Sequence, residues 1–157
     1  MTNDKLRKHL TALLQWEDAH INFDTAIQYI PETSRGVLPP GHPHSLWQIL
    51  EHLRIAQHDI LDFCINPDYK ELAWPKDYWP SSAAPASSES WEKSIHQYRS
   101  DREKLIQLAL NPKLDLTDHI PHGTGQTYLR ELLLVADHNA YHIGQIVLVR
   151  RLLDIWP

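Results

Sequence analysis

The chain has 157 residues, of which 42% are apolar and 22% charged, a composition typical of one globular domain over residues 1–157 and not of a disordered or fibrous chain. A net charge of −5 with scattered lysines and arginines argues against a nucleic-acid partner, and the absence of an apolar run of about 20 residues argues against a membrane span. The one cysteine excludes an internal disulfide, and the first residues show no signal-peptide pattern, so the expected compartment is the cytoplasm.

The first predicted helix covers residues 4–30. Apolar residues recur there at the intervals of one helical face, and Pro31 ends the pattern. This set comprises Leu6, Leu10, Leu13, Trp16, Phe23 and Ile27. A rival apolar face lies about 120° away around the helix axis. It comprises Trp16, Ala19, Phe23, Ala26 and Ile30.

The next two predicted helices carry clear end signals. The second begins at SLWQ, where Ser45 is a cap and Gln48 completes a capping box, and Pro67 ends it. The third covers residues 88–110, where the apolar residues again follow helical spacing, and the Asn-Pro pair that follows stops it.

The fourth predicted helix, residues 127–153, is apolar on nearly all sides, as a buried helix is. No stretch alternates convincingly as a strand does, so the predicted fold is all-α, a four-helix bundle. The long connections 31–44, 66–87 and 111–126 allow crossovers between parallel neighbours. The middle one is rich in Trp and Tyr, so we expect it to pack on the bundle mouth or on another subunit of a homodimer.

Two histidines of the last helix, His138 and His142, lie four positions apart in HNAYHIGQ. Eleven histidines in 157 residues give about one such pair by chance, so the spacing alone carries little information. Their surroundings carry more, because Glu131, His138, His142 and Gln145 fall in one band about 60° wide between apolar positions. Buried imidazoles need partners, which are either one shared metal ion or separate hydrogen-bond acceptors across the core.

His52 is the candidate third ligand. It lies on the flank of the apolar stripe of the second helix, whereas His58 lies about 120° further around and should meet solvent. Three histidine ligands leave coordination positions open, as catalytic metal sites do. His122, in the loop before the last helix, is expected to approach the site from the loop side. The remaining histidines are assigned to solvent: His9, His42, His44, His96 and His119.

Two motifs carry a resemblance to a known family. PHSLWQILEHL and GQTYLRELLLVADHNAYHIGQI, followed by a final arginine-leucine-tryptophan segment, resemble the DinB/YfiT-like family of small metalloenzymes over essentially the whole chain. The resemblance implies a four-helix bundle with long crossover connections. It also implies a divalent metal held by three histidines, which fall on His52, His138 and His142. Some members of the family are similar to thiol S-transferases and others to hydrolases.

The expected function is that of a metal-dependent enzyme acting on a small-molecule substrate. The resemblance favours a thiol S-transferase or related group transferase that uses a low-molecular-weight thiol against a small electrophile. A metal-dependent hydrolase, a non-catalytic metal- or ligand-binding module and a structural protein with core histidines are the alternatives. Zinc or nickel suits three imidazoles, and iron is a further option. Cys64 lies about 18 Å along the helix from His52, so we expect a core residue there.

Four further side chains are candidates to lie near the metal, and none is assigned a catalytic role. Glu131 and Gln145 share the band of the histidines and are candidates to orient them. His20 and Asp24 follow one side of the first helix together with Glu17, and they either line the pocket or form a solvated edge.

Overall fold

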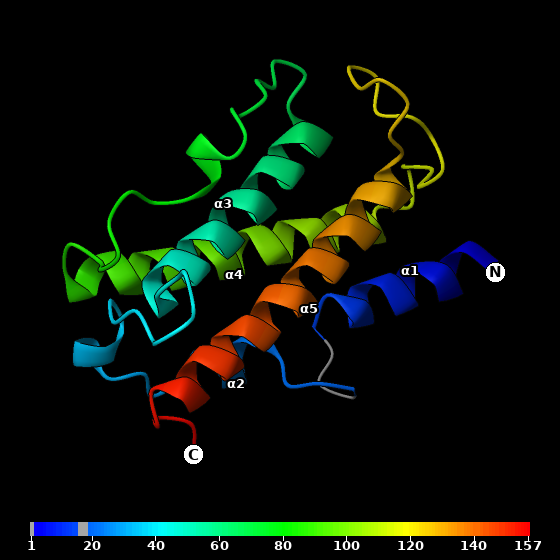
Figure 1. The fold of residues 1–157 in the computed structure, drawn as a ribbon. Coiled ribbons are helices and arrows are strands. Elements are labelled where there is room, and N and C mark those ends of the chain that lie inside the picture. Colours follow the sequence, from blue (N-terminus) through cyan, green and yellow to red (C-terminus); the bar gives the residue numbers. More distant parts are fainter. Residues whose placement is uncertain (1, 16–18) are drawn as a thin grey trace.

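The computed structural model describes residues 2–15 and 19–157 of the chain. Over these ranges it contains five helices and no strand (Figure 1), so the prediction of an all-α fold is confirmed. Two short 3-10 helices, Glu32–Ser34 and Lys76–Tyr78, lie in the connections. The helices are α1 (Thr2–Leu13), α2 (Phe23–Ile27), α3 (Leu46–Ile65), α4 (Ser88–Leu110) and α5 (Tyr128–Leu152).

The caps of α3, α4 and α5 lie where the sequence predicts them. The Ser45 hydroxyl accepts a hydrogen bond from the Gln48 backbone, and the Gln48 side chain accepts one from the Ser45 backbone, which completes the capping box of α3. Ser87 caps α4 and Thr127 caps α5 through their hydroxyl oxygens. Local hydrogen bonds therefore fix the starts of the three long helices that form most of the core.

The prediction of one continuous helix over residues 4–30 is wrong. α1 ends at Leu13, and a separate helix, α2, begins after Asn22, whose side chain accepts a hydrogen bond from the Thr25 backbone. The physical reason is the pair of rival apolar faces: Leu10 of the first face packs in one buried cluster, whereas Ala26 of the rival face packs in another, and one straight helix cannot bury both faces. Trp16 and Glu17 lie outside the described residues.

α3 lies at the centre of the packing. It contacts both α4 and α5, and in Figure 1 α3 and α5 lie side by side in front of α4. α1 packs on α4 and α5, and α2 packs on α5. Two buried apolar clusters fill the interior. The first includes Phe23, Ile49, Trp91, Tyr98 and Ile146, and the second includes Leu10, Leu61, Leu105, Leu116 and Val135.

α5 combines an apolar surface with buried polar groups. In the described part of the chain it is the one helix long and apolar enough to cross a membrane, judged by length and composition only. The core helix of a globular protein meets the same test, and α5 packs on three other helices of this fold. Its buried polar side chains are Glu131, Asn139, His142 and Arg150.

Candidate metal centre

Three histidines from two helices meet where α3 and α5 pack together. His52 lies on α3, and His138 and His142 lie one turn apart on α5, with one ring nitrogen of each within 4.8 Å of the others. The Nε2 atoms of His52 and His138 are 3.1 Å apart. His52 and His142 are buried, and His138 is half-buried. The structure thus brings together the three residues named as candidate ligands from the sequence.

Hydrogen bonds to the far side of two rings turn their Nε2 atoms toward this meeting point. The Nδ1 atom of His52 lies 2.9 Å from the backbone oxygen of Tyr78, which only accepts, so Nδ1 carries the proton and Nε2 the lone pair. The Nδ1 atom of His142 lies 2.7 Å from Oε1 of Gln145, an arrangement that again leaves Nε2 free as a ligand.

The donor set fits a divalent cation. Lone pairs of neutral imidazoles that face one another repel unless a proton or a cation lies between them, and imidazole nitrogen is a common ligand of divalent transition metals. The Nδ1 atom of His138 is buried without a hydrogen-bond partner of ordinary geometry, although the side chain of the adjacent Asn139 interacts with the ring. A metal bound through Nε2 would fix it.

The pKa values of the three imidazoles favour the neutral, metal-binding form of each ring. Burial, together with the neighbouring His52, lowers the pKa of His138 to about 4. Burial, together with His138 and His52, lowers the pKa of His142 to about 4. Burial also lowers the pKa of His52, although the hydrogen bond to Tyr78 opposes it. All three rings are therefore neutral at pH 7, as metal ligation requires.

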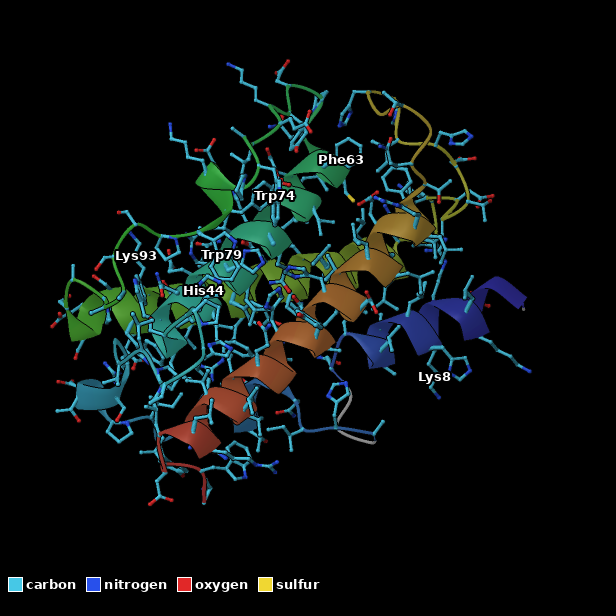
Figure 2. The ribbon with its side chains drawn as sticks, viewed as in Figure 1. Lys8, His44, Phe63, Trp74, Trp79 and Lys93 are labelled. Atoms are coloured by element: carbon cyan, nitrogen blue, oxygen red, sulfur yellow. The ribbon has the colours of Figure 1, made fainter. Side chains whose placement is uncertain are left out.

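Aromatic side chains of the loop 66–87 cover the ring of His52. Trp79 stacks on it with ring centroids 3.9 Å apart and an interplanar angle of 2°. Trp79 also stacks on His44, again at 3.9 Å, and Figure 2 shows these two residues together with Trp74 beside α3. The loop thus packs within its own chain, at the histidine cluster, which is one of the two arrangements expected for it.

Sequence analysis missed several residues around the cluster. His42 and His44, expected in solvent, are half-buried, and the Nδ1 atom of His44 is buried without a partner. Stacking on Trp79 is the physical reason for the burial of His44. Tyr78 was missed because it acts through its backbone, which no side-chain pattern reveals. The one available signal was the high Trp and Tyr content of the loop.

Of the four further candidates, Gln145 contacts a histidine of the cluster. Glu131 is buried and pairs with Arg130 at 2.6 Å, two turns of α5 before His138. His20 is exposed, and its Nδ1 atom lies 2.8 Å from the backbone oxygen of Ile21. Asp24 forms ion pairs with two arginines of α4. His20 and Asp24 therefore make their described contacts away from the histidine cluster.

Asp24 lies between two arginines of α4. Its carboxylate oxygens are 2.7 Å from Nε of Arg99 and 2.9 Å from Nη2 of Arg102. Burial raises the pKa of Asp24, but the hydrogen bonds and charges of the two arginines outweigh burial and lower it overall. The described contacts of Asp24 therefore hold α2 against α4 and assign it no part in the histidine cluster.

A cavity of about 470 Å³ lies on the same seam of α3 and α5. Leu134, one helical turn before His138, contributes to its wall, as do Tyr78 and Glu131. His122 also lines this cavity, and its Nε2 atom lies 2.7 Å from the backbone oxygen of Phe63. The other lining residues include Asp59, Tyr69, Glu71, Thr124, Gln126 and Arg130.

Cys64 is buried in the core, and burial together with the charge of Glu131 raises the pKa of its thiol to about 12. His58 is exposed, with its Nδ1 atom 2.9 Å from a carboxylate oxygen of Asp101. Both residues therefore lie as expected, one in the core and one at the surface, and neither belongs to the histidine cluster.

Comparison with known proteins identifies a family. A protein-family model described as the DinB superfamily matches residues 5–146, a range that includes all three clustered histidines. No curated protein and no solved structure matches the chain.

Proposed function

The chain belongs to the DinB superfamily, and from that premise we propose that it is a metal-dependent enzyme that transfers an exogenous thiol to a small electrophile. The observation that carries the proposal is the convergence of three neutral, largely buried imidazoles on one point. We further infer that α1, α3, α4 and α5 form the four-helix bundle with crossover connections that the family resemblance implies. The long connections between α3, α4 and α5 support this arrangement.

His52, His138 and His142 would hold the ion, and zinc or nickel suits three imidazole ligands best. Three protein ligands leave coordination positions for a substrate, whereas a structural zinc normally has four. When bound, such an ion acts as a Lewis acid that lowers the pKa of a coordinated thiol or water. Gln145 and the backbone of Tyr78 orient two of the ligands, and Trp79 excludes water from one face of His52.

An exogenous thiol is required because the chain cannot supply one. Cys64 is its one cysteine, and it is buried with a pKa raised to about 12. A thiol with that pKa is protonated at neutral pH and is not a nucleophile. The cavity on the seam of α3 and α5, at about 470 Å³, has a volume that is ordinary for small-molecule pockets, and its wall includes Tyr78 and Leu134 but none of the three clustered histidines.

The test is a conjugation assay on protein loaded with Zn²⁺ or Ni²⁺. The electrophile is a monohalobimane or a dinitrohalobenzene, and the thiols are glutathione, cysteine, bacillithiol and mycothiol. We expect metal-dependent, saturable conjugation of one thiol, a loss of at least about 100-fold in His142→Ala, and unchanged activity in His96→Ala, whose histidine is exposed on α4.

Two outcomes would reject this function. Equal rates in wild type and His142→Ala would remove the link between the histidines and the reaction. Cleavage of esters or amides that requires the metal, with no thiol conjugated above the His142→Ala background, would replace the transferase with a hydrolase.

A further inference from the structure

One residue of the loop, Tyr78, contacts α3 at two separate places. Its backbone oxygen accepts a hydrogen bond from Nδ1 of His52 at 2.9 Å, and its hydroxyl donates one to Oδ2 of Asp59 at 2.6 Å. His52 and Asp59 are seven residues apart, so they lie on one side of the helix and are separated by two turns, roughly 10 Å along the axis. Tyr78 therefore spans this distance with its main chain at one end and its phenol at the other.

The Asp59 carboxylate binds the loop through two hydrogen bonds. Its second carboxylate oxygen, Oδ1, accepts a hydrogen bond from the hydroxyl of Tyr69 at 2.9 Å, so two phenols from one loop bind one carboxylate. Hydrogen bonds to a charged acceptor are stronger than those between neutral groups. Burial and the bond to Asp59 raise the pKa of both phenols, so both remain donors at neutral pH.

The residue after Tyr78 restrains the same ligand in a different way. Trp79 lies flat on the ring of His52, whereas the Tyr78 backbone oxygen contacts its edge. Rotation of His52 about its side-chain bonds would break both contacts. The position of the Tyr78–Trp79 segment thus determines where Nε2 of His52 points.

We propose that Asp59 is a positioning residue for the metal centre. Through the hydroxyl of Tyr78 it holds the Tyr78 backbone oxygen against Nδ1 of His52, and so directs Nε2 of His52 toward His138 and His142. This inference rests on the metal site of the proposed function. The principle is general, because groups behind the ligands of a metal set ligand orientation, and their loss commonly lowers metal affinity about 10- to 100-fold.

The chain offers a matched pair of variants. Tyr78→Phe and Tyr69→Phe each remove one phenol hydroxyl from Asp59, but only Tyr78 carries the backbone oxygen that contacts His52. We expect Zn²⁺ affinity, measured by competition with a chromophoric chelator, to fall about 10-fold in Tyr78→Phe and to change less than about 2-fold in Tyr69→Phe. The Co²⁺ absorption spectrum should change in Tyr78→Phe alone.

A double-mutant cycle tests the connection to Asp59 directly. Asp59→Ala should lower Zn²⁺ affinity at least as much as Tyr78→Phe, and Tyr78→Phe should have no further effect in the Asp59→Ala background. Additive losses would overturn the proposed route through the Tyr78 hydroxyl. Urea unfolding of each metal-free variant, compared with wild type, separates a change at the site from a general loss of folding.

A second readout requires no metal. The ¹⁵N chemical shifts of the His52 ring in metal-free protein report which nitrogen carries the proton. We expect the Nδ1–H form in wild type and Tyr69→Phe and a mixture of tautomers in Tyr78→Phe. Equal Zn²⁺ affinities and equal His52 spectra in the two tyrosine variants would overturn the inference.

The two proposals fail in different ways. If wild type binds neither Zn²⁺ nor Co²⁺, the proposed function is wrong, and the role of Asp59 is judged by the His52 tautomer alone. A tautomer change confined to Tyr78→Phe then supports the positioning of His52, and identical spectra reject it. If wild type binds metal and the two tyrosine variants have equal metal affinities and equal His52 spectra, only the inference about Asp59 fails.

Discussion

The Nδ1 atom, which points away from the meeting point of the three rings, has a different environment in each clustered histidine. Nδ1 of His52 is bonded to a backbone oxygen and Nδ1 of His142 to Gln145, whereas Nδ1 of His138 is buried without a partner. The side-chain amide of Gln145, three residues along α5, therefore orients His142, whereas no hydrogen bond of ordinary geometry holds Nδ1 of His138. At His142, the effect of ring orientation on metal affinity can thus be separated from the effect of the ligand nitrogen itself, because Gln145 and His142 can be substituted one at a time.

We predict that purified wild-type protein carries close to one divalent ion per chain. His142→Ala removes a ligand and should lose most of that metal, whereas Gln145→Ala keeps the ligand but frees its ring, so affinity should fall about 10- to 100-fold. Elemental analysis gives the metal content, and competition titration gives the affinity. His96→Ala, an exposed histidine on α4, is the control and should match wild type. Full metal content in His142→Ala would contradict the assignment.

The sequence predicted the ligand candidates because they lie on regular helices. A step of 100° per residue places His138, His142 and Gln145 on one side of α5, and the structure has the last two in contact. The same reasoning failed for His44 and Tyr78, which lie outside the long helices. Their positions depend on how the loop folds over α3, and no periodic pattern encodes that course.

At the scale of elements, α2 depends on a residue far along the chain. α2 has five residues, too few for a helix to be stable alone. Arg150, fully buried near the end of α5, donates a hydrogen bond to the backbone oxygen of Ala26 at 2.7 Å, and its guanidinium lies 4.7 Å from the ring of Trp156. The short helix is therefore held to α5 by a buried charged donor.

We predict that Arg150→Met loosens α2 without unfolding the rest of the chain. The backbone oxygen of Ala26 would be left buried without its donor, which costs about 2 kcal/mol for a hydrogen bond to a charged group. Hydrogen exchange should become faster for the amides of residues 23–27, and urea unfolding should show the loss of stability. Arg151→Met changes the exposed neighbour and should leave both measurements unchanged, so equal exchange rates in the two variants would refute the role of Arg150.

Caps explain which elements could be predicted. Ser45, Ser87 and Thr127 each accept a backbone hydrogen bond at a helix start, and the predicted ranges of α3, α4 and α5 agree with the structure to within about two residues. The break between α1 and α2 was missed because apolar spacing continues across it. Asn22 was the local signal for a new helix start, but the longer periodic pattern concealed it.

At the scale of the whole molecule, a buried carboxylate joins two of the long helices. Asp101 on α4 is fully buried and accepts hydrogen bonds from Gln97 and Lys104 of α4, both at 3.0 Å. On the α3 side, Nδ1 of His58 lies 2.9 Å from Asp101 Oδ2. Burial raises the pKa of Asp101, but the hydrogen bonds from Gln97, Lys104 and His58 outweigh burial and lower it overall.

A lowered carboxyl pKa makes the fold sensitive to acid. The stabilisation from Asp101 is fully present above the unfolded-state pKa of about 3.9, and it is lost as pH falls through the lower folded-state pKa. We predict that Asp101→Asn is less stable than wild type by about 1–3 kcal/mol at pH 7 and that the difference shrinks below pH of about 4. Urea unfolding at a series of pH values measures it.

The control for this prediction is Asp68→Asn, which alters an exposed carboxylate in the loop after α3. Its stability should follow that of wild type across the same pH series. If the free energies of unfolding of Asp101→Asn and wild type differed by the same amount at every pH, the charge of the Asp101 carboxylate would not be the source of the stabilisation.

The all-α class followed from composition and periodicity, because long apolar repeats at helical spacing leave no room for strands. The placement of the loop 66–87 did not follow, although its aromatic residues indicated that it packs on something. Docking of a loop depends on surfaces brought together by folding, here the face of α3 that carries both His52 and Asp59.

The shared position of Tyr78 has a thermodynamic consequence. Tyr78 lines the cavity, and its backbone oxygen accepts a hydrogen bond from His52, so one residue contributes to both the cavity and the histidine cluster. A small molecule whose affinity for the cavity differs between the metal-loaded and metal-free protein must change metal affinity by the same factor, because linkage between two binding equilibria is reciprocal. Metal titrations with and without a cavity occupant would therefore measure how strongly the cavity and the histidine cluster are coupled.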